Sequence, residues 1–276
     1  MAIRFSKMHG AGNDFVLIDL RQGQAAPDAA LARAIGNPHT GVGFDQLLGI
    51  ETSSRSDCIA SYRIWNSDGS LAQQCGNGAR CVAAWLIRDG AASLPRFRLD
   101  SPAGVIDVEC LADSRFELDM GRPEFEPAKI PLKMKQPADS YAAEVAGELI
   151  AFGAASMGNP HALLEVDDVD FADVEKMGAA LQASSLFPES VNVGFAQLVA
   201  RDEIRLRVYE RGAGETLACG SGACAAVAIL AKQGKVGDRV AVHLPGGRLD
   251  ISWPGGDAPI RMAGPTAFVF EGEWLQ

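Results

Sequence analysis

The chain has 276 residues, of which 47% are hydrophobic and 22% are charged, a composition typical of a folded soluble protein with room for two domains. Its net charge of −10 would repel a polyanion, and no apolar run reaches the roughly 18–20 residues of a membrane span. The first residues also lack the apolar stretch and cleavage site of a signal peptide, so we expect a cytosolic protein whose partner is neither nucleic acid nor a membrane.

The first half of the chain predicts strands around one apolar helix. Alternating aromatic and β-branched residues predict a strand over 62–65, which a turn and then Cys75 follow. A helix is predicted over 77–88, and its stretch Cys-Val-Ala-Ala-Trp-Leu-Ile at 81–87 is apolar on every side, which is typical of a helix that is buried all round rather than on one face. Shorter alternating runs predict further strands over 97–101 and 104–111.

The second half predicts the same plan. Prolines and charges interrupt every pattern over 121–140, which indicates a boundary between two domains. A second wholly apolar helix is predicted over 221–232, directly after Cys219. The remaining alternating runs predict strands over 204–209, 239–244, 249–253 and 267–272.

The two halves also resemble each other residue by residue. Cys-Gly-Asn-Gly-Ala at 75–79 recurs as Cys-Gly-Ser-Gly-Ala at 219–223, an offset of 144 residues. Two more blocks recur in the same order at other offsets, namely Val-Gly-Phe-Asp-Gln-Leu at 42–47 with Val-Gly-Phe-Ala-Gln-Leu at 193–198, and Gly-Asn at 12–13 with Gly-Asn at 158–159. An ordered set of matches indicates an internal duplication. We therefore predict an α+β fold of two pseudo-symmetric domains, each a curled mixed β-sheet around a central buried helix, with the active site in the cleft between them.

The two cysteines that precede the helices occupy a position suited to chemistry. The first turn of a helix leaves backbone N–H groups unpaired and carries the positive end of the helix dipole. A thiol there ionises more easily, and a carboxylate can dock on the same N–H groups. Cys75 and Cys219 therefore predict a pair of acid–base groups that acts on a small carboxylate-bearing molecule.

Such a pair can invert a stereocentre. One sulfur, as thiolate, removes the α-proton of an amino acid, and the other, as thiol, delivers a proton to the opposite face. The carbanionic transition state then needs fixed N–H donors in a site that excludes water. The sequence carries no recognisable pyridoxal phosphate machinery, so we expect no cofactor.

The other cysteines are expected to be structural. Cys81 and Cys224 lie on apolar helix stretches and Cys58 and Cys110 in apparent strands, where a thiol packs as a small hydrophobic group. The chain has no Cys-x-x-Cys spacing and its four histidines lie far from the cysteines, so a structural zinc site is not expected either.

Several motifs together make the chain similar to the diaminopimelate epimerase family. They are Lys-Met-His-Gly-Ala-Gly-Asn-Asp-Phe at 7–15, Gly-Val-Gly-Phe-Asp-Gln-Leu-Leu at 41–48, Gln-Cys-Gly-Asn-Gly-Ala-Arg-Cys at 74–81, Met-Gly-Asn-Pro-His-Ala at 157–162, Asn-Val-Gly-Phe at 192–195 and the whole run 209–225. The one departure is Ser221, where the family has threonine, and this substitution keeps the hydroxyl group.

The resemblance implies a cofactor-independent isomerase that converts LL-2,6-diaminopimelate to meso-diaminopimelate for lysine and peptidoglycan precursors. It implies a homodimer, and a C-terminal segment that returns to the first domain, so that the domains cover 1–121 with 266–276, and 122–265. Cys75 and Cys219 are implied as the acid–base pair, with His161 and Glu210 assisting the thiols or orienting the reacting amino group. The implied substrate-binding residues are Asn13, Gln46, Asn66, Gly76, Asn77, Asn159, Asn192, Glu210, Arg211, Gly220 and Ser221.

Other functions stay open at this point. Proline racemases and hydroxyproline epimerases also use paired cysteines, but Glu210 and Arg211 favour a substrate with a second polar end. A phenazine-biosynthesis-like isomerase or a binding protein would not need the two thiols. A thiol-disulfide oxidoreductase normally uses Cys-x-x-Cys, which the chain lacks.

Overall fold

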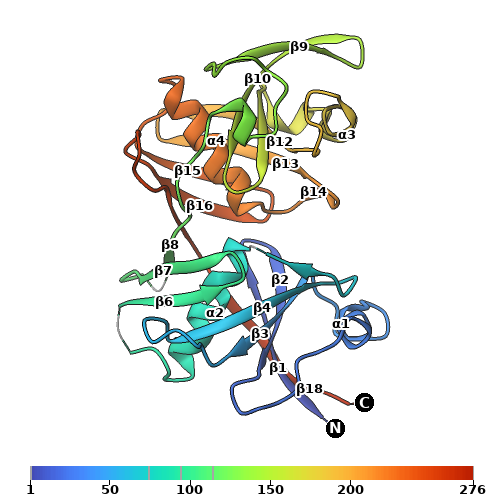
Figure 1. Ribbon diagram of the computed structural model, residues 1–276, viewed down its shortest axis with the longest axis vertical. Coiled ribbons are helices and arrows are strands. Elements are labelled where there is room, and N and C mark those ends of the chain that lie inside the picture. The colour runs from blue at the N-terminus through green and yellow to red at the C-terminus, as the bar shows by residue number, and fades with distance from the viewer. Residues whose placement is uncertain (1, 74, 94, 114, 276) are drawn as a thin grey trace. The chain divides into compact units, whose positions relative to one another are not determined.

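The computed structural model describes residues 2–73, 75–93, 95–113 and 115–275, so Gln74, which opens one of the motifs above, lies outside the described residues. The chain divides into two compact units (Figure 1). Unit 1 consists of Met1–Leu118 together with Gly264–Gln276, and unit 2 consists of Asp119–Ala263. The chain thus leaves unit 1, builds unit 2 and returns to unit 1 for its last strand.

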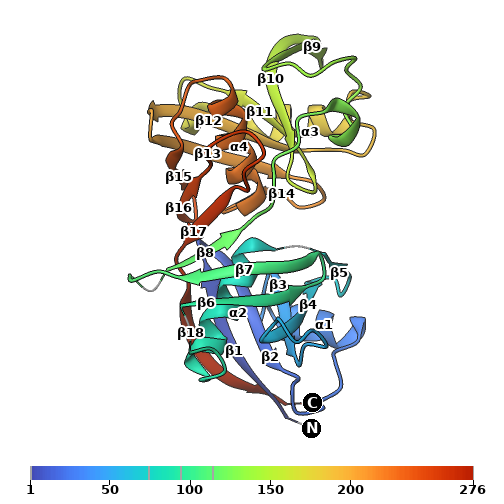
Figure 2. The ribbon, with the colours of Figure 1, turned by 60° about the vertical axis from the view of Figure 1, so that its left-hand side comes forward.

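Unit 1 is a mixed sheet around a helix. Its strands are β1 (Ile3–Gly10), β2 (Asn13–Asp19), β3 (Gln46–Glu51), β4 (Ala60–Asn66), β5 (Leu71–Ala72), β6 (Arg96–Ser101), β7 (Gly104–Cys110), β8 (Phe116–Asp119) and β18 (Ala267–Trp274). They pair in the order β18–β1–β2–β3–β4–β6–β7–β8, with β5 also on β4; β2–β3 and β4–β6 are parallel. Strands β1 and β18 lie side by side in both views (Figure 1, Figure 2). Helix α2 (Gly76–Arg88) packs against β1, β2, β3 and β6, while α1 (Ala29–Gly36) packs against β3 and β4.

Unit 2 has the same construction. Its strands are β9 (Tyr141–Val145), β10 (Glu148–Ser156), β11 (Pro160–Glu165), β12 (Asn192–Ala200), β13 (Glu203–Glu210), β14 (Gly214–Thr216), β15 (Arg239–Leu244), β16 (Gly247–Ser252) and β17 (Arg261–Gly264). They pair in the order β9–β10–β11–β12–β13–β15–β16–β17, with β14 also on β13; β11–β12 and β13–β15 are parallel. Helix α4 (Gly220–Lys232) packs against β10, β11, β12 and β16, and α3 (Val174–Ala183) lies on β12, β13 and β14. Two single 3-10 turns, η1 (Pro127–Lys129) and η2 (Val169–Phe171), complete the unit.

The common strand order confirms the predicted duplication and the α+β fold. Each unit carries its two parallel pairs at the same two places in the sheet, and each sheet wraps around one helix. Both central helices also begin one residue before the predicted start, at Gly76 and Gly220.

The strand register corrects one part of the sequence comparison. Gln46, at the start of β3, pairs with Asn66, the last residue of β4. In unit 2 the register of β12 on β13 puts Asn192 opposite Glu210, one step beyond the pair Val193 and Tyr209. The match of 42–47 with 193–198 is therefore wrong, because 42–44 precede β3 whereas 193–195 lie inside β12. The structural counterpart of Gln46 is Asn192.

The central helices are buried along most of their length. Residues 77–84 of α2 and 222–230 of α4 are all buried, as expected from their apolar stretches 81–87 and 224–230. The buried residues of α2 also include Arg80, which donates to Asn77. Two residues after the end of each helix lies a glycine with positive φ, Gly90 at 81° and Gly234 at 72°, the conformation that glycine adopts without a steric penalty. The helices α2 and α4 have 13 residues each, and no helix in the described ranges is long and apolar enough to cross a membrane.

The packing of β10 on α4 is tight enough to test. A Cβ atom added at Gly153 would lie 2.2 Å from Cγ2 of Ile229. Because a β-branched side chain in a buried helix cannot move aside freely, we expect Gly153→Ala to lower the free energy of unfolding by roughly 1–3 kcal/mol. Thermal melting followed by circular dichroism measures this as a lower Tm.

The matched control is Gly237→Ala, where the nearest atom to an added Cβ is the Arg201 carbonyl oxygen at 3.7 Å. This variant is expected to melt within about a degree of the wild-type protein, since surface changes are usually within ±0.5 kcal/mol. Equal melting temperatures for the two variants would contradict the close approach of β10 to α4.

Candidate active site

Cys75 occupies the N-cap of α2 in unit 1. Its backbone is extended, with φ −153° and ψ 103°, and its sulfur accepts a hydrogen bond from the Gly78 N–H at 3.3 Å. The sulfur therefore lies at the positive end of the helix dipole and satisfies one of the N–H groups that a helix start leaves unpaired. This is the position in which a thiolate is stabilised.

Asn13 presents its carbonyl oxygen to this sulfur. The distance from Cys75 Sγ to Asn13 Oδ1 is 3.7 Å, and the Asn13 amide donates to Asp45 Oδ2 at 2.6 Å. Asp45 and Asp14 also exchange backbone-to-carboxylate bonds at 2.9 and 3.0 Å, and Lys7 forms an ion pair with Asp14. Since the amide nitrogen is held by Asp45, the oxygen of Asn13 is the atom that faces the thiol.

The other predicted residues of unit 1 lie on β3 and β4 and in the first turn of α2. Gln46 donates to Asn66 Oδ1 at 3.0 Å across the β3–β4 ladder. In the part of the chain that the structure describes, Gln46 Oε1 is buried and has no hydrogen-bond partner. Gly76 opens α2, and the buried Asn77 side chain accepts from Arg80 at 2.8 Å. Unit 1 thus supplies amide groups and backbone N–H donors around Cys75.

Cys219 occupies the N-cap of α4 in unit 2 and has a carboxylate as partner. Its thiol donates to Glu210 Oε2 at 3.0 Å, and the Thr216 hydroxyl donates to Glu210 Oε1 at 2.6 Å. The residue is only 5% exposed. Burial, and then the negative charge of Glu210, raise the pKa of Cys219 well above its usual range. Cys219 is therefore a thiol at neutral pH, with a proton acceptor in contact.

A second chain of hydrogen bonds connects Cys219 to His161. The Ser221 hydroxyl lies 3.7 Å from Cys219 Sγ and accepts from the Asn159 amide at 3.3 Å, while Asn159 Oδ1 lies 2.9 Å from His161 Nε2. Burial, and then the positive charge of Arg211, lower the pKa of His161 to about 3. The imidazole is therefore neutral, donates through Nε2, and reaches the thiol only through Asn159 and Ser221.

Asn192 and Arg211 form the outer part of this group. The Asn192 side chain accepts from the Arg211 backbone N–H at 2.9 Å and donates to the Pro160 carbonyl at 3.1 Å. The exposed Arg211 guanidinium donates to the Glu189 carbonyl at 2.9 Å. Its remaining donors are available for a carboxylate, which a guanidinium binds with two parallel bonds.

The strand register pairs residues described above for unit 1 with equivalent residues in unit 2. Asn13 corresponds to Asn159, Gln46 to Asn192, Asn66 to Glu210 and Cys75 to Cys219. Unit 1 therefore carries neutral amides where unit 2 carries a carboxylate, and Arg211 has Ser67 as its counterpart. Both groups can hold an anion on a helix N-terminus and move a proton through a thiol.

Two residues in these groups lie outside the sequence prediction. Asp45 fixes the orientation of Asn13, and Thr216 contacts Glu210. Both residues lie inside the quoted motifs, at 41–48 and 209–225, but only the pairing of strands brings these two side chains to their partners. In the described ranges, no three His, Cys, Asp or Glu side chains lie close enough to hold a metal ion.

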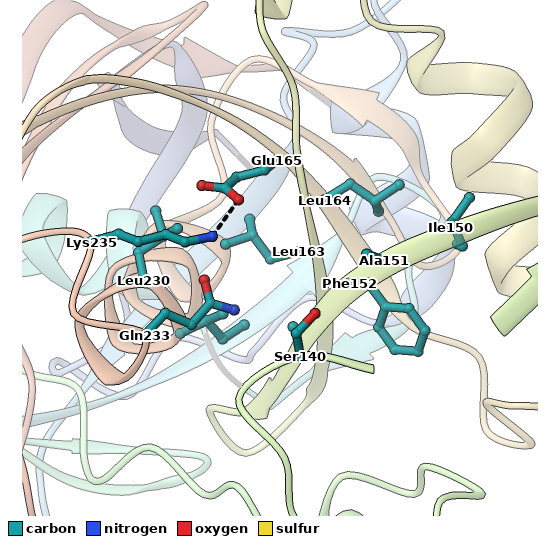
Figure 3. Close-up of a pocket in the computed structure, with 12 residues that line it drawn as sticks. Ser140, Ile150, Ala151, Phe152, Leu163, Leu164, Glu165, Leu230, Gln233 and Lys235 are labelled. Atoms are coloured by element: carbon teal, nitrogen blue, oxygen red, sulfur yellow. Dashed lines mark hydrogen bonds and ion pairs between the residues drawn. The ribbon is translucent and has the colours of Figure 1, made fainter. Parts of the chain in front are cut away.

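A different hollow in unit 2 contains none of the predicted residues. It has a volume of about 370 Å³ and lies between the C-terminal end of α4 and the strands β10 and β11. Figure 3 shows Glu165 and Lys235 as an ion pair at one side and Phe152 and Ile150 at the other. Its walls carry one ion pair and otherwise mostly apolar groups, and neither Cys75 nor Cys219 lines it.

A family model and individual relatives both match this chain to the same family. The sequence model of the diaminopimelate epimerase family matches residues 5–126 and 153–269. A relative from Xanthomonas axonopodis pv. citri (strain 306), named diaminopimelate epimerase, is 58% identical over 273 residues, which are 99% of this chain and 96% of the relative.

Two solved structures have the same fold at low identity. A hydroxyproline epimerase from Agrobacterium vitis gives a TM-score of 0.70 at 17% identity, over 99% of this chain and 91% of that one. A phenazine biosynthesis protein of the PhzF family from Bacillus anthracis gives a TM-score of 0.70 at 15% identity, over all of both chains. At this identity the two structures show the common fold alone.

The neutral, buried His161 predicts a loss of stability in acid. An unfolded chain binds a proton on this histidine below about pH 6.5, whereas the folded chain excludes it down to about pH 3. The free energy of unfolding therefore falls by about 1.4 kcal/mol for each unit by which the pH drops between these limits. His161→Phe, which introduces the residue that unit 1 has at the equivalent Phe15, is expected to flatten the fall of Tm between pH 7 and 4.

The exposed His39 supplies the control, since His39→Gln is expected to keep the wild-type pH dependence of Tm. The slope is compared rather than the absolute Tm, because His161→Phe also removes the contact with Asn159. A slope in His161→Phe as steep as that of the wild type would show that His161 is not held neutral.

The contact of Glu210 with Cys219 predicts a change in thiol reactivity. In Glu210→Gln the negative charge is lost, so the pKa of Cys219 falls and more thiolate is present at pH 8. We expect alkylation of Cys219 by iodoacetamide to become roughly three- to tenfold faster, because the thiolate is the reactive form. Peptide mass spectrometry measures this rate, with alkylation of Cys110 as internal reference. A rate equal to that of the wild type would contradict the contact.

Proposed function

This chain belongs to the diaminopimelate epimerase family, and from that membership we propose that it interconverts LL- and meso-2,6-diaminopimelate without a cofactor, as an isomerase of lysine and peptidoglycan precursor synthesis. The observation that carries the proposal is the equivalent position of Cys75 and Cys219, each at the N-cap of the buried helix of its unit. A duplicated thiol at a duplicated helix start supports a reaction that needs one acid and one base of the same kind.

The proton transfers are as follows. The thiolate of one cysteine takes the α-proton, so that an S–H bond forms, the C–H bond breaks and its electron pair stays on the α-carbon. The thiol of the other cysteine then gives its proton to the opposite face and becomes the thiolate. Both sulfurs must therefore reach one α-carbon, and in the reverse direction they exchange roles.

Backbone N–H groups stabilise the charge that develops. The first-turn residues Gly76 and Asn77, and Gly220 and Ser221, supply donors at the positive ends of α2 and α4. Such donors hold the α-carboxylate and stabilise the carbanion as negative charge moves onto it. Their effect is greatest when water is excluded from the bound substrate.

The charged groups of unit 2 suit a substrate with two amino-acid ends. Arg211 binds a carboxylate through its two parallel N–H donors, and Asn159 and Asn192 add neutral donors and acceptors. In unit 1, Asn13, Asn66 and the buried Gln46 oxygen can accept from an ammonium group. Glu210 accepts the proton of Cys219 when that thiol becomes the base, and His161 orients this group as a neutral donor.

We further propose that the enzyme works in the cytosol as a homodimer. Two-thiol chemistry needs the reduced sulfur that a reducing compartment maintains. The homodimer rests on the resemblance to the family.

The test is exchange with solvent. The protein is incubated with LL-diaminopimelate in deuterated water containing a reductant and a chelator, and the product is analysed by chiral chromatography with mass spectrometry. We expect meso product that carries one α-deuterium from the solvent. Cys75→Ala and Cys219→Ala are each expected to lower the rate by about 10²–10⁴, the usual contribution of a positioned acid or base.

Cys110→Ala serves as the matched control, because Cys110 lies on β7, away from the helix starts, and its loss is expected to leave the rate unchanged. Exchange with proline but not with diaminopimelate would favour a racemase of the proline type instead. Full activity in either Cys75→Ala or Cys219→Ala would rule out the two-thiol reaction.

A further inference from the structure

Glu210 is held from both sides of its carboxylate. One oxygen, Oε2, accepts from the thiol of Cys219 at 3.0 Å, and the other, Oε1, accepts from the hydroxyl of Thr216 at 2.6 Å. With both oxygens engaged, rotation of the carboxylate would break two hydrogen bonds. The hydroxyl therefore decides which oxygen faces the sulfur.

The backbone places Thr216 for this contact. Strands β13 and β14 are antiparallel, with Val208 opposite Thr216 and Glu210 opposite Gly214. Glu210 and Thr216 are thus diagonal neighbours on one face of the hairpin, a separation that side chains can bridge.

On the opposite face of the hairpin a separate ion pair joins the two strands. Arg207 donates to both oxygens of Glu215, at 2.6 and 2.8 Å, and also to the Val169 carbonyl at 2.9 Å. A bidentate pair of this kind has a defined geometry. It fixes the three-residue strand β14 to β13, so that Thr216 has a defined position relative to Glu210.

Unit 1 lacks both the hydroxyl and the carboxylate at the equivalent positions. Ala72 pairs with Ile64 as Thr216 pairs with Val208, so the counterpart of Thr216 has no hydroxyl. The counterpart of Glu210 is Asn66, whose amide donates to Ser70 instead. Within one duplicated fold, the hydroxyl occurs only in the half that has the carboxylate. This coincidence indicates that the hydroxyl serves the carboxylate rather than the strand pairing, which both halves share.

We propose that Thr216 is a positioning residue for the reaction: its hydroxyl holds the Glu210 carboxylate aimed at Cys219, so that Glu210 can accept the thiol proton. The inference rests on the proposed function for its effect on turnover. A donor to a carboxylate favours the ionised form, and an ionised carboxylate is the acceptor that Cys219 needs when it acts as base. Thr216 does not contact the substrate in this role, but acts through Glu210.

The test compares Thr216→Val, which keeps the shape and removes the hydroxyl, with Thr216→Ser, which keeps the hydroxyl. For Thr216→Val we expect kcat to fall about tenfold with KM within a factor of two, as for the loss of one hydrogen bond to a charged group. The pH profile of kcat/KM is expected to differ from that of the wild type, because the proton acceptor of Cys219 is no longer held in place. Thr216→Ser is expected to restore the wild-type profile.

A second measurement does not depend on turnover. When the carboxylate is no longer held against the sulfur, alkylation of Cys219 by iodoacetamide is expected to become about threefold faster in Thr216→Val and to stay at the wild-type rate in Thr216→Ser. Thr52→Val, at an exposed position, controls for the loss of a threonine hydroxyl as such. If Thr216→Val does not fold, Thr216→Ala is measured in its place with the same expectations.

The outcomes separate this inference from the proposed function. A wild-type protein without epimerase activity would remove the proposed function, and the alkylation rates would still decide the role of Thr216. An active wild type with Thr216→Val equal to it in kcat, pH profile and alkylation would overturn the inference alone. A defect shared equally by Thr216→Ser and Thr216→Val would also overturn it, because a packing role, not the hydroxyl, would then be at fault.

Discussion

A helix that is apolar on every side and begins at a cysteine is the constraint on which both units depend. Such a helix is stable only when it is covered all round, and in each unit the sheet curls until it does so. The first turn is the exception, since its backbone N–H groups have no partner within the helix. The polar end of an otherwise apolar helix is therefore where the thiol lies, in unit 1 at Cys75 and in unit 2 at Cys219.

Duplication of this plan keeps the scaffold and lets the side chains diverge. The strand ladders put Asn66 and Glu210 at equivalent positions, so one thiol has amides around it and the other has a carboxylate in contact. A nearly symmetric pair of proton-transfer groups combined with unlike binding groups is what a substrate with one reacting end and one distal end requires. The shared fold explains the chemistry common to both halves, and the divergent positions explain the asymmetry.

Burial determines which groups of unit 2 carry charge. It raises the pKa of Cys219 and lowers the pKa of His161 to about 3, so both are neutral near pH 7. The charged groups have hydrogen-bond partners. Glu210 accepts from two donors, and the exposed Arg211 donates to the Glu189 carbonyl. Uncompensated buried charge is costly, which accounts for the dense hydrogen bonding around these residues.

The sequence by itself determined the duplication, the two buried helices to within one residue, and the positions of the two thiols, because apolar periodicity and recurring glycine–cysteine motifs are local signals. It failed where the answer depends on pairing between distant strands. The block at 42–47 matched the wrong segment, and Asp45 and Thr216 were not recognised as partners of Asn13 and Glu210. Only the tertiary structure decided these contacts, because the neighbours of a strand residue are set by the register of a hydrogen-bonded ladder, and a shift of one residue turns every side chain to the other face.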